Sequence, residues 1–158
     1  MKKIAILLFV GASLTGCGGN SEKNNATSET VTTESKTENA NPSYDPERGE
    51  GKFKDVAVAA TVDQTMATAG EKIYSVKCGS CHKLTSEKLV GPGWLGVTDR
   101  HKADWIMNFV TNTDAMLNKD PKAQAQLEIC LVRMPNQNIA DEEARNLYEF
   151  MRRNDGIK

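Results

Sequence analysis

Two cysteines and a histidine lie within one short run, Cys78-Gly79-Ser80-Cys81-His82. Their types and spacing would allow them to bind one metal cofactor jointly. Two cysteines three positions apart on a helical turn present both sulfur atoms to one edge of a flat ligand. The histidine that follows can direct its imidazole at a metal from the same side. A Cys-x-x-Cys-His run is a specific signal for covalent haem attachment. The sequence therefore predicts one covalent haem c, bound through thioethers at Cys78 and Cys81, with His82 as an axial ligand of the iron.

Two other uses of this run are disfavoured by its surroundings. A thioredoxin-type disulfide would leave His82 unexplained, and no βαβ pattern surrounds the cysteines. A zinc site would need further ligands from His101 and Cys130, and adjacent Cys81 and His82 bind a single ion awkwardly. Cys130 itself is interpreted as a small buried apolar residue on a helix.

A second axial ligand is needed if the iron only carries electrons, because an open position would bind small molecules. The candidates are Met66, Met107, Met116, Met134, Met151 and His101. Met134 precedes Pro135 in a polar segment, and the proline prevents a continuing helix and favours an extended conformation. We therefore expect Met134 to ligate the iron from a loop. Met116, near a helix end, is the next candidate, and His101 is interpreted as a solvated loop residue.

Apolar residues at helical spacing predict four helices, at about 66–80, 103–116, 121–131 and 141–153. Asp120 is the expected N-cap of the third helix, with Pro121 at its first position. The fourth helix has an acidic first turn and ends in Arg152-Arg153, which suits the helix dipole. No segment alternates as a strand would. The predicted fold class is all-α, a small fold of about four helices around one covalent haem.

The N-terminal segment reads as an export signal. Met1-Lys2-Lys3 is basic, residues 4–10 are continuously apolar, and Leu14-Thr15-Gly16-Cys17 resembles the bacterial lipobox. This pattern predicts a lipoprotein signal peptide at 1–16 and lipidation of Cys17, which would anchor the protein facing the periplasm or the cell surface. Residues 17–64 are expected to form a flexible acidic linker, because much of this stretch is Ser, Thr, Asn and Glu. The haem domain is then expected at 65–158.

The balance of charge excludes a nucleic-acid-binding role. The formal net charge is −1, and the predicted haem domain is nearly neutral, without the basic surplus that nucleic-acid binding requires.

Residues from about 66 to 158 resemble a small monohaem cytochrome c of class I. Gly70, Tyr74 and Cys78 keep the intervals of that family's first helix, where the glycine lets the first and last helices cross at an aromatic residue. Phe150 or Tyr148 fits that aromatic position. Gly91-Pro92 matches a family pair in which the proline carbonyl accepts a hydrogen bond from the axial histidine. Met134-Pro135 resembles the family's ligand loop.

The resemblance implies an electron-transfer protein rather than an enzyme. Together with the lipobox-like run at Cys17, it suggests a membrane-anchored carrier in a respiratory chain, with redox partners such as a terminal oxidase or a reductase. Four lysines near the motif are candidates to guide an acidic partner: Lys72, Lys77, Lys83 and Lys88. Trp94, Arg100 and Trp105 are candidate donors to the haem propionates. Two alternatives remain, a haem enzyme or gas sensor with an open distal position, and a fixed subunit of a larger complex.

Overall fold

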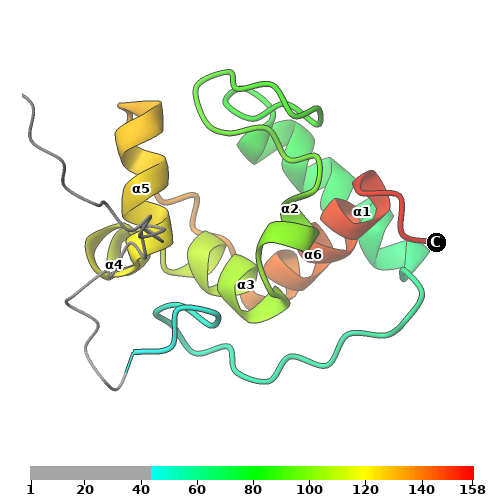
Figure 1. Cartoon of the computed structure of the whole chain (residues 1–158). Helices are drawn as coiled ribbons and strands as arrows, with labels where there is room; N and C mark the ends of the chain where they lie inside the picture. Colours follow the sequence, from blue (N-terminus) through cyan, green and yellow to red (C-terminus); the bar gives the residue numbers. More distant parts are fainter. Residues whose placement is uncertain (1–43) are drawn as a thin grey trace, which may run out of the picture. The chain divides into compact units, whose positions relative to one another are not determined.

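The computed structural model describes residues 44–158, in which every regular element is a helix and no strand is present (Figure 1). The helices are α1 (Gln64–Ile73), the π-helical η1 (Tyr74–Cys78), α2 (Val97–Arg100), α3 (Ala103–Thr111), α4 (Thr113–Lys119), α5 (Pro121–Cys130) and α6 (Asp141–Asn154). The all-α prediction is confirmed. The predicted signal peptide, Cys17 and the first part of the predicted linker lie outside the described residues.

The close crossing of α1 and α6 organises the domain, and Gly70 permits it. A Cβ atom at this glycine would lie 2.1 Å from the backbone oxygen of Asn146 and 2.8 Å from Cβ of Phe150. Only a residue without a side chain allows the two helices to come this close. The predicted crossing is confirmed, and Phe150 is the aromatic residue beneath it.

The first predicted helix changes its winding before it reaches the first cysteine of the motif. The α-helix ends at Ile73, and a π-helical turn follows in which the N–H of Gly79 donates to the carbonyl of Tyr74 at 2.8 Å. Single π turns of this kind often occur at functional sites. Here Cys78 is buried at the end of the turn, whereas Val76 is 84% exposed.

The second predicted helix, 103–116, is wrong as a continuous element. It divides at Asn112, whose backbone leaves the helical region (φ −138°, ψ 46°) between α3 and α4. The side chain of Asn112 donates to the carbonyl of Glu50, which lies far away in sequence. The third helix begins as expected, since Asp120 caps it by accepting from the N–H of Ala123 at 2.7 Å. Helix α2 has only four residues, too few to show a helical period.

Residues 44–63, called the strap here, pack against the helices by specific hydrogen bonds. Asn108 on α3 is fully buried; it accepts from the N–H of Phe53 at 2.9 Å and donates to the carbonyls of Arg48 and Phe53. Arg152 on α6 donates to the carbonyl of Ala59 at 2.7 Å. The prediction that this segment belongs to the flexible linker is corrected. Buried polar side chains of α3 and α6 hold the strap in place, and its own Val62 is buried while Phe53 and Val56 pack against the core.

Candidate haem-binding site

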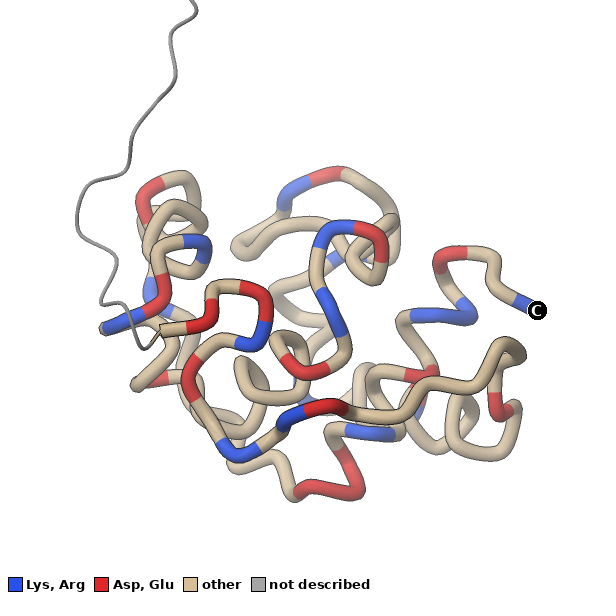
Figure 2. The backbone as a smooth tube through the Cα atoms, turned by 60° about the horizontal axis from the view of Figure 1, so that its bottom comes forward, with Lys and Arg blue, Asp and Glu red and all other residues tan. Residues whose placement is uncertain are grey.

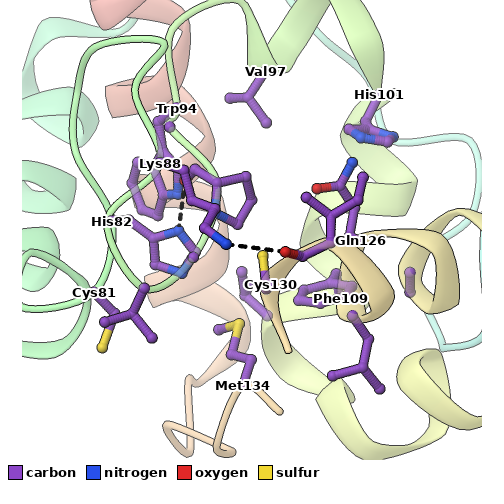
Figure 3. Close-up of a pocket in the computed structure, with 18 of the residues that line it drawn as sticks. Cys81, His82, Lys88, Trp94, Val97, His101, Phe109, Gln126, Cys130 and Met134 are labelled. Atoms are coloured by element: carbon purple, nitrogen blue, oxygen red, sulfur yellow. Dashed lines mark hydrogen bonds between the residues drawn. The ribbon is translucent and has the colours of Figure 1, made fainter. Parts of the chain in front are cut away.

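A cavity of about 370 Å³ lies between the loop that follows the Cys-x-x-Cys-His run and the segments around α5 (Figure 3). Cys81, His82 and Pro92 line one part of it, while Cys130 and Met134 come from the end of α5 and the loop beyond. The remaining lining is largely apolar and includes Val97, Ile106, Phe109, Val110 and Leu127. The volume falls in the usual range for pockets that hold a cofactor or other small molecule.

His82 is held by hydrogen bonds at both its ring and its backbone. Its Nδ1 lies 2.9 Å from the carbonyl oxygen of Pro92, and its own carbonyl accepts from the hydroxyl of Tyr74 at 2.6 Å. Because a carbonyl can only accept, Nδ1 is the donor and Nε2 keeps its lone pair for a metal. Burial lowers the pKa of His82 and outweighs the opposing effect of the Pro92 carbonyl. The ring is therefore held in the neutral form that ligates iron.

Two neighbours restrict the movement of the His82 ring. A Cβ atom on Gly91 would lie 2.3 Å from Cε1 of His82, so the backbone of this residue presses directly against the imidazole. The Trp94 ring packs 5.6 Å from the His82 ring and 4.9 Å from that of Tyr74. Sequence reasoning matched Gly91 to a family pair but did not find this contact, because it depends on how the loop folds back.

Cys78 and Cys81 are free thiols rather than a disulfide pair. The N–H groups of Cys81 and His82 both donate to the carbonyl of Cys78 at 3.0 Å, which holds the run in one tight turn. Burial raises the pKa of the Cys78 thiol to about 11. Cys78 lies next to the cavity-lining residues rather than among them, while Cys81 lines the cavity.

The methionines separate clearly by position. Met134 is half-buried and lines the cavity. Met116 is fully buried outside the cavity lining, and its sulfur accepts from the N–H of Glu50 at 2.9 Å. Met107 is also buried away from the cavity, whereas Met151 lines it from within α6. Met134 is thus the cavity-lining methionine that lies on a loop.

Two residues have surroundings that differ from those expected. His101 lines the cavity and stacks on Trp105 with ring centroids 3.8 Å apart, so its interpretation as a solvated loop residue is wrong. Cys130 is half-buried on the cavity wall rather than packed in the core, which corrects its interpretation as a buried apolar residue. Both residues lie in the pocket that Figure 3 shows. No local sequence pattern predicts that either of them lines a cavity.

The lysines near the motif are mostly engaged within the domain. Lys77 forms an ion pair with Glu143 at 3.1 Å, and Lys83 pairs with Glu87 at 2.8 Å. Lys88 donates to the carbonyl of Ile129 at 2.9 Å, which links the two sides of the cavity (Figure 3). Figure 2 shows Lys and Arg interspersed with Asp and Glu along the described chain.

The residues present fit a covalent haem. An apolar cavity, two free cysteines in one turn beside it, and a half-buried histidine with one fixed nitrogen meet the requirements for thioether attachment and axial ligation. The fold and site thus define a small all-α haem protein. A family model described as cytochrome c matches residues 67–155, more than half of the chain, and the protein belongs to that family. The family binds haem c covalently, a single haem suits a domain of this size, and its members are generally electron carriers.

Solved structures of the same family are similar along most of their length. A cytochrome c from Rhodothermus marinus is 27% identical, with a TM-score of 0.65, over 68% of this chain and 92% of its own. An engineered form of that cytochrome, described as Rma TDE, gives a TM-score of 0.67 at 27% identity, over 71% of this chain and 99% of its own. No curated protein matched significantly. Among residues 44–158, no helix is long and apolar enough to cross a membrane.

Proposed function

We propose that the protein is a membrane-anchored carrier of single electrons in a respiratory chain. In this proposal Cys78 and Cys81 attach the haem, and His82 and Met134 are the axial ligands of its iron. The observation that carries the proposal is the orientation of His82. Its Nδ1 is engaged by the Pro92 carbonyl at 2.9 Å, which leaves Nε2 available within the cavity that Met134 also lines.

Bound haem supplies reversible one-electron chemistry at its iron. The contribution of the chain is to keep the surroundings of the iron the same in both oxidation states. Pro92 fixes the orientation and raises the basicity of the His82 ring. Gly91 and Trp94 limit the movement of that ring, and the apolar lining excludes water. Little rearrangement is then needed when an electron arrives or leaves.

The lipobox-like run that ends at Cys17 supports the proposed anchor. Lipid at this residue would hold the domain at a membrane facing the periplasm or the cell surface, since two or more acyl chains bind stably. A terminal oxidase or a reductase is a suitable class of partner, and such redox encounters use small, short-lived interfaces. Since Lys77 and Lys83 are paired internally, their charges are less available to an acidic partner.

Replacement of Met134 by Ala tests the proposed ligand set. We expect the ferric holoprotein to lose the weak sulfur-to-iron charge-transfer band and its ferrous form to bind CO, because the variant leaves one axial position open. Met151→Leu is the matched control, since Met151 lines the same cavity from a helix. Retention of the band in Met134→Ala, or its loss in Met151→Leu, would rule out Met134 as the ligand.

A further inference from the structure

The segment that carries Met134 is not held in place by burial. Residues 131–138 are each exposed or at most half-buried. Within residues 44–158, the hydrogen bonds that join the stretch 129–138 to a part of the chain outside α5 and this loop come from two cationic side chains, Lys88 and Arg133. Polar contacts therefore have to position the proposed iron ligand.

Arg133 joins this stretch to α4. Its guanidinium donates to the backbone carbonyl and Oδ1 of Asp114 at 3.3 and 3.0 Å, and to Oδ1 of Asn118 at 3.1 Å. Helix α4 directly precedes α5 in the chain. The bonds of Arg133 therefore join the loop to its own side of the cavity and do not connect it with the side that carries His82.

Lys88 connects the stretch to the opposite side of the cavity. It lies on the loop that follows His82, and its Nζ donates to the carbonyl of Ile129 at 2.9 Å (Figure 3). This loop is itself joined to the haem motif, because the N–H of Gly91 donates to the carbonyl of Cys81 at 2.9 Å. The bond from Lys88 therefore sets the position of the end of α5 relative to the haem motif.

The end of α5 is a suitable acceptor for a lysine. The carbonyl of Ile129 is among the last four of the helix, which have no intrahelical partner. The C-terminal end of a helix carries partial negative charge, and α5 has no basic residue in its own last turn. Lys88 supplies the positive charge from across the cavity. Within residues 44–158 it has no carboxylate partner, unlike Lys83, which pairs with Glu87.

We propose that Lys88 is a positioning residue for Met134, and that its bond to Ile129 lengthens the time for which Met134 stays bound to the iron. Lys88 is exposed and lines the cavity, so this bond crosses the cavity at its solvent side. Met134 follows Ile129 by five residues, and a shift of the helix end would therefore move the ligand. The inference rests on the proposed ligand set. With Lys88 in place, the iron is less often open to small molecules.

The test is the rate at which imidazole replaces Met134 in the purified ferric holoprotein, followed by the loss of the sulfur-to-iron charge-transfer band. At saturating imidazole this rate equals the rate at which the methionine leaves the iron. Lys88→Met keeps a side chain of similar length but cannot donate, so the rate should rise roughly three- to tenfold, as expected for the loss of one hydrogen bond. The band should still be present before imidazole is added, because Met134 remains the ligand.

Two further variants separate the effect of the bond from that of the charge. Lys88→Arg keeps a donor and should have a rate close to that of the unsubstituted protein. Lys83→Met removes the same charge from the same loop, but Lys83 pairs with Glu87 and does not line the cavity, so the rate should not change.

An unchanged rate in Lys88→Met, an equal increase in Lys83→Met, or a rate in Lys88→Arg as high as in Lys88→Met would overturn the role of Lys88 alone. If the unsubstituted ferric protein lacks the charge-transfer band, the ligand set itself is wrong and this role fails with it.

Discussion

At the scale of single residues, the site depends on how tightly the axial histidine is held. The ring of His82 has a hydrogen-bond partner at Nδ1, an aromatic neighbour in Trp94 and the backbone of Gly91 against its edge. The residues that make these contacts lie in the loop after His82, which has no regular secondary structure. The backbone N–H groups of Val90 and Gly91 donate to the carbonyl of Cys81, which fixes this loop to the haem motif itself.

Gly91→Ala should destabilise the holoprotein, because the added methyl group would clash with the His82 ring. The added Cβ would lie 2.3 Å from Cε1 of His82, so the ring must move away from Pro92. We expect a loss of roughly 1–3 kcal/mol in the free energy of unfolding of the holoprotein, as for overpacking elsewhere. Denaturant unfolding followed at the haem absorption measures it.

Gly79→Ala is the control for this substitution. Its Cβ would have its nearest neighbours at 3.5 Å, an ordinary contact, and Gly79 has a helical backbone conformation that alanine adopts readily. A Gly91→Ala protein as stable as Gly79→Ala would show that the loop yields without affecting His82.

Sequence patterns predicted some of these residues and missed others for physical reasons. The motif at Cys78, Cys81 and His82 is local, and spacing alone identifies it. The contact of Pro92 with His82 was implied by the family resemblance, and the structure contains it. His101 was interpreted as solvated because it precedes a helix in a polar stretch. The stacking on Trp105 that partly buries it comes from packing that no local pattern reveals.

At the scale of elements, the strap and the helices form one hydrogen-bonded unit. The side chain of Asp104 on α3 accepts from the N–H groups of Asp55 and Val56, while Arg145 on α6 donates to the carbonyl of Ala57. Tyr44, at the start of the described chain, donates to Asp120 between α4 and α5. The bonds at Asp55, Val56 and Ala57 satisfy backbone groups of a segment that has no helix or strand of its own, while the Tyr44 bond joins two side chains.

Asn108→Ala tests the contribution of the strap. The substitution leaves the N–H of Phe53 and the carbonyls of Phe53 and Arg48 without their side-chain partner. Since Asn108 is fully buried, we expect the free energy of unfolding to fall by about 3 kcal/mol. Denaturant unfolding of the holoprotein provides the measurement.

Asn112→Ala is the comparison for this variant, because Asn112 makes one hydrogen bond to the strap, at 3.2 Å to Glu50, and should cost less. Equal stability of Asn108→Ala and the unsubstituted protein would mean that the strap adds nothing to the fold.

Helix prediction succeeded where a cap marks the start of a helix, as in α5, or an amphipathic stripe runs along it, as in α6, and it failed where long-range contacts decide. Helix α5 begins at Asp120-Pro121 as expected, and α6 covers 141–154 against the predicted 141–153. The division between α3 and α4 was missed because Asn112 leaves the helix to bond with the distant strap. The strap was assigned to the linker because most of the periodic apolar pattern begins after it, whereas the helices supply the partners that order it.

At the scale of the whole molecule, we propose that a folded haem domain is held at a membrane by a predicted lipid anchor at Cys17. Cys17→Ala should release the protein from membranes, because the acyl chains attached to this cysteine provide the proposed attachment. Fractionation of cells that express each form, with the haem absorption as the marker, measures the distribution. The spectrum itself should be unchanged, since the substitution lies outside the haem domain. A Cys17→Ala protein that stays with the membrane fraction would contradict lipid anchoring.

The central claim is a single covalent haem whose iron is ligated by His82 and Met134. The most direct test is the visible and near-infrared spectrum of the purified protein in both oxidation states, with CO added to the ferrous form. We expect a low-spin ferric spectrum with the weak sulfur-to-iron charge-transfer band, and a ferrous form that does not bind CO. A high-spin ferric spectrum together with CO binding would contradict it and would identify an open distal position instead.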